Sequence, residues 1–307
     1  MNTRVLSLAL AIVLTVVLAL SSCGAQTASE TTAVPTEKST TESASTATET
    51  KTEPKVKTTS EAPTKATEPD TQPETKKPTN KSDGKNVVIV LDAGHDSTTH
   101  TRNHPNLGVN EQDLNLKIAK TAYKRLKKYN GVTVYLSRPD GTCPIDRYNC
   151  PEVNNYPEPC IKARTDFADR KKANLFVSFH CNASTGNLGA SAGGAEVYVT
   201  KYPKFYSKCK KLGKIILRNI TASVDLSSRG VLTRSKPEKG NYDDGTVKDF
   251  YYLLSNNVDN NRPAVIIEHA YMDNTHDNAI LKDVKNLKRL GIADADAIAE
   301  YYGLELK

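Results

Sequence analysis

Four polar side chains occupy positions that packing alone does not explain: His95, Glu111, His180 and Glu268. Two imidazoles and a carboxylate form a common ligand set for catalytic Zn²⁺, which keeps a fourth coordination position for water. A further glutamate can act as the general base toward that water. These residue types therefore predict a metal-dependent hydrolase.

Two of these side chains are placed by elements that the apolar pattern predicts. Residues 87–91 form a continuous apolar run, which is typical of a strand covered on both faces. His95 follows that strand at its carboxyl end, where open α/β sheets commonly hold their sites. A helix is predicted from Glu111 to about residue 128, and Glu111 shares the sheet-facing stripe of Leu114 and Ile118. The alternative for Glu111 alone is a helix-start acid stabilised by the helix dipole.

The other two side chains close predicted strands. Alternation in the strand that ends at His180 places Ser178 on the same face, which indicates a polar cleft rather than a core histidine. Glu268 ends the apolar run 264–267 and is either a functional acid or a solvent-facing strand end. The next residue, His269, is predicted to face away and to be structural.

The remaining pattern alternates strands and helices. Further strands are predicted near residues 132–136, 195–199 and 250–254, and further helices near residues 161–172, 203–222 and 286–301. This order predicts an α/β fold, a single domain with a largely parallel or mixed central sheet flanked by helices. Residues 86–307 number about 220, which is enough for one domain with a sizeable core.

The N-terminus predicts export. Arg4 is followed by an apolar stretch over residues 5–20, which is typical of a secretory signal peptide over residues 1–22. The stretch is shorter than the roughly 20 residues that a membrane span needs. The sequence Leu20-Ser21-Ser22-Cys23 resembles a bacterial lipobox with Cys23 as the lipidated residue. The alternative is an ordinary signal peptide that contains a cysteine.

Residues 23–85 are almost entirely Thr, Ser, Glu, Lys, Pro and Ala, without an aromatic residue. Such a segment cannot bury enough apolar surface to offset its conformational entropy, so we expect a disordered linker. Its roughly 60 residues would have a mean span of about 40 Å. The segment is interpreted either as a tether for a membrane-anchored enzyme or as a spacer of no particular length.

The net charge of +7 belongs mostly to the predicted domain, because lysines and acidic residues nearly cancel along the linker. A basic domain would favour polyanionic surroundings such as anionic lipid or wall polymers. The alternative is a basic surface without a dedicated partner. No nucleic-acid-binding motif is present, and an exported chain would rarely meet nucleic acid.

Four successive motifs resemble those of the zinc-dependent N-acetylmuramoyl-L-alanine amidases. They are Asp92-Ala93-Gly94-His95, residues 110–116 (NEQDLNL), residues 175–183 (LFVSFHCNA), and Val265-Ile266-Ile267-Glu268 with Tyr271 and Asn274. The resemblance covers nearly all of residues 86–304. It implies an α/β enzyme that cleaves the amide between muramic acid and L-alanine in peptidoglycan. We expect a monomer that is exported as a membrane-anchored lipoprotein facing the cell wall.

The resemblance also implies residue roles. His95, Glu111 and His180 match the family's ligands to one Zn²⁺, and Glu268 matches its catalytic glutamate. Arg164 also matches a familiar position, without an assigned role. The alternatives are a tethered wall-binding lipoprotein without catalysis and a zinc peptidase that acts on stem peptides.

The departures from the family pattern are local. Asp96-Ser97 stands where the family usually has two glycines, and residues 142–159 look like an insertion. Cysteines 143, 150 and 160 lie in or beside that insertion, where one disulfide among them is plausible in an exported domain. Cys181 and Cys209 either meet or remain core thiols, and the sequence leaves this connectivity open.

Overall fold

The computed structural model describes residues 86–95, 103–140, 142 and 158–307. A six-stranded sheet forms its centre, in the order β4-β1-β5-β8-β6-β7. The strands are β1 (Val87–Ala93), β4 (Val132–Leu136), β5 (Leu175–Asn182), β6 (Ala195–Val199), β7 (Ser228–Leu232) and β8 (Ala264–Tyr271), and a small separate pair is β2 (Asn103–His104) and β3 (Val109–Asn110). The helices are α1 (Glu111–Leu126), α2 (Glu158–Arg170), α3 (Pro203–Ser223), α4 (Tyr252–Asp259), α5 (Thr275–Lys282) and α6 (Val284–Tyr302).

The sheet is mixed. Strands β4, β1, β5 and β8 run parallel, β6 runs antiparallel to β8, and β7 is parallel to β6. The predicted single α/β domain with a mixed sheet is therefore confirmed. Because β1, β5 and β8 are neighbours with the same direction, their carboxyl ends meet at one edge of the sheet. That edge is where parallel α/β sheets hold their ligands.

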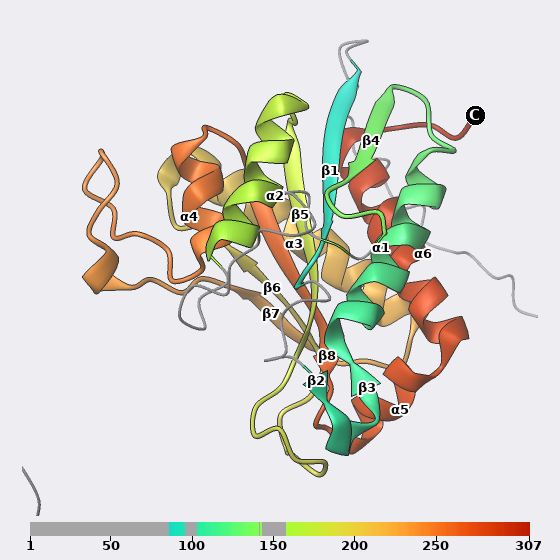
Figure 1. Cartoon of the computed structure of the whole chain (residues 1–307). Coiled ribbons are helices and arrows are strands. Elements are labelled where there is room, and N and C mark those ends of the chain that lie inside the picture. The colour runs from blue at the N-terminus through green and yellow to red at the C-terminus, as the bar shows by residue number, and fades with distance from the viewer. Residues whose placement is uncertain (1–85, 96–102, 141, 143–157) are drawn as a thin grey trace, which may run out of the picture. The chain divides into compact units, whose positions relative to one another are not determined.

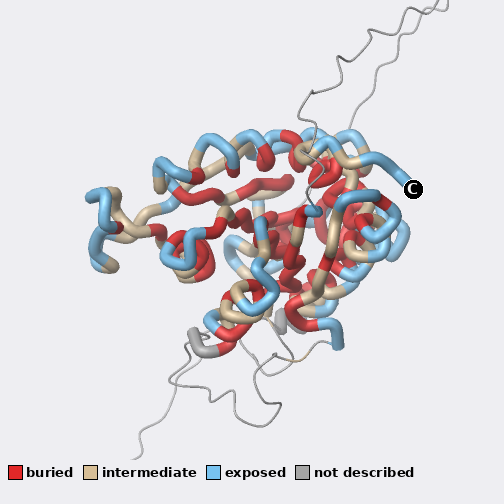
Figure 2. Tube along the Cα trace, turned by 90° about the horizontal axis from the view of Figure 1, so that it is seen from above, coloured by how far each residue is buried: buried red, intermediate tan, exposed pale blue. Residues whose placement is uncertain are grey.

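Helices cover both faces of the sheet (Figure 1). Helices α1, α3 and α6 pack on one face over the larger apolar core, and α2 and α4 pack on the other over a smaller one. Buried positions follow the sheet and the inward sides of the helices, while exposed positions lie on the outer turns (Figure 2). This burial explains why β1 reads as an uninterrupted apolar run.

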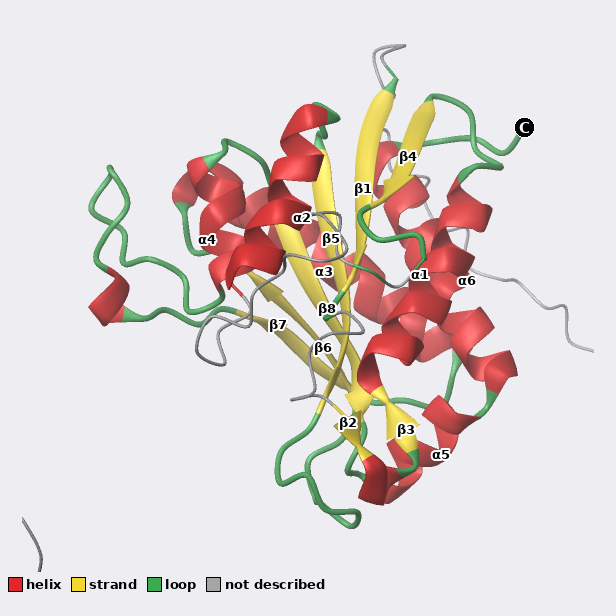
Figure 3. Ribbon diagram, viewed as in Figure 1, coloured by secondary structure: helices red, strands yellow, loops and turns green. Residues whose placement is uncertain are grey.

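One predicted element is wrong, and strand β7, helix α5 and the short strands β2 and β3 were not predicted. Residues 250–254 were expected to be a strand, because aromatic and branched residues favour strands. The structure instead starts helix α4 at Tyr252, and the burial of Leu253, Leu254 and Val258 follows a helical period (Figure 3). Strand β7 went unnoticed because its residues, Ser228 to Leu232, are partly exposed and include a glycine. The other predicted elements are present, with ends shifted by a few residues.

Several predictions fall outside the described residues. These are the signal peptide over residues 1–22, the lipidated Cys23, the linker up to residue 85, the glycine replacements at Asp96-Ser97, and most of the insertion with Cys143 and Cys150. Among the helices that are described, none has the length and apolar character needed to cross a membrane.

Candidate active site

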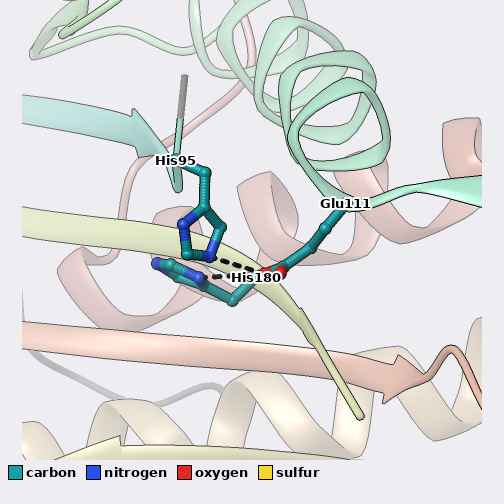
Figure 4. A group of neighbouring side chains, drawn as sticks. All are labelled: His95, Glu111 and His180. Carbon is teal, nitrogen blue, oxygen red and sulfur yellow. Dashed lines mark hydrogen bonds and ion pairs between the residues drawn. The ribbon is translucent and has the colours of Figure 1, made fainter. Parts of the chain in front are cut away.

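Three of the four predicted site residues converge at the carboxyl edge of the sheet (Figure 4). His95 follows β1, Glu111 is the first residue of α1, and His180 lies on β5. The His95 Nε2 atom lies 3.1 Å from Glu111 Oε1, and the His180 Nδ1 atom lies 3.2 Å from the same oxygen. One potential ligand atom from each residue lies within 4.8 Å of the others. Segments far apart in the sequence thus place two imidazoles around one carboxylate oxygen.

His95 is held by the backbone that precedes it. The carbonyl of Ala93 accepts hydrogen bonds from Arg138 and Arg164, and the carbonyl of Gly94 accepts from Arg138 at 2.9 Å and from Asn115 at 3.2 Å. His95 itself has φ 61°, a left-handed conformation that is uncommon for a side chain with a Cβ. Such a conformation persists only where the surroundings fix it, and the two buried guanidinium groups provide that restraint.

Glu111 is buried although it is charged. The Asn110 side chain caps α1 by accepting from the backbone N–H of Gln112, which fixes where the helix begins. Burial alone would raise the pKa of Glu111, but His95 and His180 outweigh it and hold the pKa well below its ordinary value. The Asn115 side chain and the backbone N–H of Cys181 also donate to the carboxylate. Glu111 therefore offers an ionised carboxylate oxygen at neutral pH.

A hydrogen-bond chain orients the ring of His180. The Ser178 hydroxyl donates to Asp92 at 2.7 Å, so its oxygen is left to accept from His180 Nε2, 3.0 Å away. Burial raises the pKa of Asp92, but Arg164 and two serine hydroxyls more than offset this and lower it. Burial, together with His95, lowers the pKa of His180, so its ring is neutral at neutral pH. With Nε2 protonated, the unprotonated Nδ1 faces Glu111.

This arrangement fits a metal ion. The His180 Nδ1 atom and the Glu111 carboxylate oxygen lie 3.2 Å apart, and a cation between them could bind both once Nδ1 carries no proton. Ligand atoms bound at about 2.0–2.1 Å with tetrahedral angles lie about 3.3 Å apart, close to the two nitrogen–oxygen distances here. Two imidazoles with one carboxylate are a zinc-type donor set. The second nitrogen of His180 is also held by an outer partner, as metal-bound histidines usually are.

Glu268 belongs to the same site. In the sheet its Cα pairs with that of His180 on β5, and the residue is only 8% exposed. It lines a cavity of about 320 Å³ together with the three clustered residues. Strand β8 continues to Tyr271, so Glu268 does not end the strand as expected but lies within it. The carboxylate is therefore fixed by the sheet rather than by a loop.

Three other positioning residues were not predicted. Arg138 is fully buried and donates hydrogen bonds to the carbonyls of Ala93 and Gly94. The Asn115 side chain donates to the Gly94 carbonyl and to the Glu111 carboxylate. The Asp92 carboxylate accepts hydrogen bonds from Arg164, Ser137 and Ser178. Arg138 follows β4 at its carboxyl end, as His95 follows β1. Applying the same strand-end rule to every parallel strand would have found it.

The remaining histidine and cysteine predictions concern residues beside the site. His269 is fully buried and lies 2.9 Å from Asp294 and 3.0 Å from the carbonyl of His180, which agrees with a structural role. Cys181 and Cys209 are buried free thiols, so of the two alternatives the core thiols are confirmed. Burial raises the pKa of the Cys181 thiol well above its ordinary value, which disfavours the thiolate that metals bind.

Gly94 offers a direct test of this packing. A Cβ at this position would lie 2.2–2.5 Å from atoms of the His180 ring, so Gly94→Ala must displace that ring. We expect zinc affinity to fall roughly 10–100-fold, as on loss of an outer partner of a ligand. Zinc titration of the folded variant measures the effect. Gly245→Ala is the control, because it strains a turn but its Cβ meets nothing within 4 Å. Unchanged zinc affinity in Gly94→Ala would contradict the proposed position of His180.

Comparison with known proteins agrees with this geometry. The N-acetylmuramoyl-L-alanine amidase family profile matches residues 89–300. The chain therefore belongs to this family. An uncharacterized cell wall amidase of Bacillus anthracis is 25% identical over 231 residues, which are 74% of this chain and 37% of that protein. The N-acetylmuramoyl-L-alanine amidase LytC of Bacillus subtilis is 27% identical over 196 residues, 64% of this chain and 32% of that protein.

A solved structure shows the same architecture. The CwlD amidase from Clostridioides difficile, determined in complex with the GerS lipoprotein, aligns with TM-score 0.57 and 26% identity. The alignment covers 71% of this chain and 99% of CwlD. This chain spans only about a third of the length of the two Bacillus relatives. The family and its relatives support peptidoglycan amidase activity.

Proposed function

We propose that this protein is a zinc-dependent amidase that cleaves the bond between N-acetylmuramic acid and L-alanine in peptidoglycan. The observation that carries this proposal is the convergence of His95, Glu111 and His180 beside a fourth acidic residue, Glu268, in one cavity. Membership of the amidase family supports this reaction and this substrate.

Each residue has a proposed role. His95, Glu111 and His180 would hold one Zn²⁺, which when bound polarises the scissile carbonyl and lowers the pKa of water toward about 7. Glu268 would take the proton of the attacking water and pass it to the departing L-alanine nitrogen. Arg138, Arg164 and Asp92 would not touch the substrate, because they hold the backbone and rings that carry the ligands.

Product analysis on purified walls tests the proposed reaction. An amidase releases stem peptides with a new L-alanine amino terminus and leaves muramic acid with a free lactyl carboxylate. A stem peptidase would instead leave L-alanine on the glycan and expose other amino termini. A wall-binding protein without catalysis would give neither product, so the result separates all three candidates.

The organisation of the whole chain is also a proposal. Residues 1–22 would be a signal peptide, residues 23–85 a disordered tether, and residues 86–307 the catalytic domain, which we propose acts as a monomer. The cell wall amidases among its relatives support an exported protein that acts on the wall. The lipobox-like sequence that ends at Cys23 supports attachment to the membrane through a lipid.

Substitution of Cys23 tests the anchor. We expect Cys23→Ala to release the protein from the membrane or to block its processing, because the lipid would have no attachment site. Membrane fractionation measures this, with Cys209→Ala as the control, since Cys209 is a buried core thiol. Membrane association of Cys23→Ala equal to that of the unmodified chain would eliminate the anchor.

A further inference from the structure

One cation at the active-site cavity has no part in holding the proposed metal ligands. Arg234 lines the same cavity as His95, Glu111, His180 and Glu268. It lies in the segment 233–250, which projects from the end of β7 beside α4 and is drawn in orange in Figure 1. The other arginine of this cavity, Arg164, is buried against Asp92. Arg234 is exposed and lines the cavity, so its charge is accessible to a substrate bound there.

The Arg234 side chain is fixed by aromatic neighbours. Its guanidinium lies 3.7 Å from the centre of the Phe250 ring, and its charge partly offsets the rise that burial causes in the pKa of the Tyr251 hydroxyl. Stacking on an aromatic face leaves the edge of the guanidinium free to form two parallel hydrogen bonds to a carboxylate. The group is therefore oriented before any ligand arrives, which lowers the entropic cost of binding.

The backbone beneath Arg234 is also restrained. The Phe250 N–H donates to the Arg234 carbonyl at 2.7 Å, and the Lys236 N–H donates to the Lys248 carbonyl at 2.9 Å. Asp249, next to Phe250, accepts from Tyr242 and Thr200 and so joins the segment to the end of β6. These bonds fix Arg234 and Phe250, the two residues of this segment that line the cavity.

Most other arginines of the described ranges pair with a carboxylate, and Arg234 does not. Five arginines form ion pairs with carboxylates within the described ranges: Arg125, Arg164, Arg218, Arg229 and Arg262. None of the ion pairs found there involves Arg234. An oriented guanidinium without an acidic partner at a cavity is complementary to an anionic group of the ligand.

We propose that Arg234 is a specificity-determining residue that binds the α-carboxylate of the second residue of the stem peptide. This inference rests on the proposed function, which puts the muramoyl–alanine bond at the clustered residues. The residue after L-alanine is γ-linked glutamate, whose α-carboxyl group is either free or amidated. Two extended residues span about 7 Å, a length that a cavity of about 320 Å³ can hold. The enzyme would thus prefer stems with the free carboxylate.

Paired substrates test this proposal with the full-length protein loaded with zinc. The substrates are the γ-methylamides of N-acetylmuramoyl-L-alanyl-D-glutamate and N-acetylmuramoyl-L-alanyl-D-isoglutamine. Their γ-carboxyl is blocked as it is in the stem, so they differ only in the α-carboxyl group. We expect the unmodified enzyme to favour the acid by roughly 10–100-fold in kcat/KM, a typical contribution of a charge-assisted pair. Arg234→Gln should remove the preference by slowing cleavage of the acid alone. Arg234→Lys should retain part of it, because a lysine supplies charge without the planar pair of donors.

The controls separate recognition from structure. Arg218→Gln removes another exposed arginine, on the opposite face of the sheet, and should leave the preference unchanged. Equal losses on both substrates in Arg234→Gln would show that Arg234 only supports Phe250, and would overturn the proposal. A preference for the acid that survives Arg234→Gln would overturn it as well.

A binding measurement keeps the inference independent of turnover. Calorimetry with the γ-methylamides of L-alanyl-D-glutamate and L-alanyl-D-isoglutamine should show tighter binding of the acid to the unmodified protein and no difference in Arg234→Gln. If neither muramoyl substrate is cleaved at the alanine bond, the proposed function fails. The calorimetric difference would still support the carboxylate site, and equal binding of both dipeptides to the unmodified protein would reject it.

Discussion

Glu268→Gln is expected to lower muramoyl–alanine cleavage by roughly 10²-fold or more, while zinc content and folding stay unchanged. Glutamine keeps the size and hydrogen-bonding shape of the side chain but cannot take a proton from water. Because Glu268 lies inside a buried strand, the substitution leaves the backbone in place. Turnover on a soluble muramoyl peptide and the zinc content of the same preparation measure the two effects.

Glu196 provides a matched control one strand away. It pairs with Glu268 across the sheet, but its carboxylate is occupied by Asn182, Tyr198, Tyr271 and Arg229. Glu196→Gln should therefore lower stability and reduce turnover by less than about tenfold, since it takes no proton in the reaction. If Glu268→Gln instead loses its zinc, Glu268 is a ligand. If it keeps near-normal turnover, the base lies elsewhere.

His180→Ala is expected to abolish stoichiometric zinc binding. The substitution leaves at most two of the three proposed ligands, so we expect zinc affinity to fall more than about 100-fold, beyond the loss typical of an outer partner. Elemental analysis after dialysis measures the zinc that remains. Because the Ser178–Asp92 pair persists without the ring, the sheet around the site should stay folded.

His276→Ala is the control for the loss of an imidazole. His276 is exposed and pairs with Asp225, away from the cluster, so its removal should leave zinc content unchanged. A His180→Ala variant with full zinc occupancy would remove His180 from the ligand set.

The sequence was sufficient to predict the elements that carry the candidate site. His95, Glu111 and His180 each occupy a strand end or a helix start, and these positions follow from apolar periodicity. Their convergence follows from parallel strand order, which brings the carboxyl ends of β1 and β5 together. The burial of Glu111 was predicted from its place in the stripe of Leu114 and Ile118, and is observed.

What was not predicted depends on tertiary contacts. Residues 250–254 have strand-forming side chains, but a helix forms because Leu253 and Leu254 pack in the smaller apolar core while Val258, one turn on, is buried in the larger one. The strand-end rule marks Arg138 as a candidate, but its burial against the end of β1 follows only from the position of β4 beside β1. Arg234 lines the cavity although it lies in a long projecting segment. No local pattern in the sequence indicates that this part of the chain lies beside the site.

The central claim is that the clustered residues make the protein a zinc amidase, and metal removal with reconstitution tests it most directly. The full-length protein is stripped with a chelator, and the release of new L-alanine amino termini from purified walls is followed as zinc is added back. We expect no release from the stripped protein and recovery that saturates at about one zinc ion per chain, as one three-ligand site requires. Equal release by the stripped and the zinc-loaded protein would contradict the account, and so would amino termini other than L-alanine.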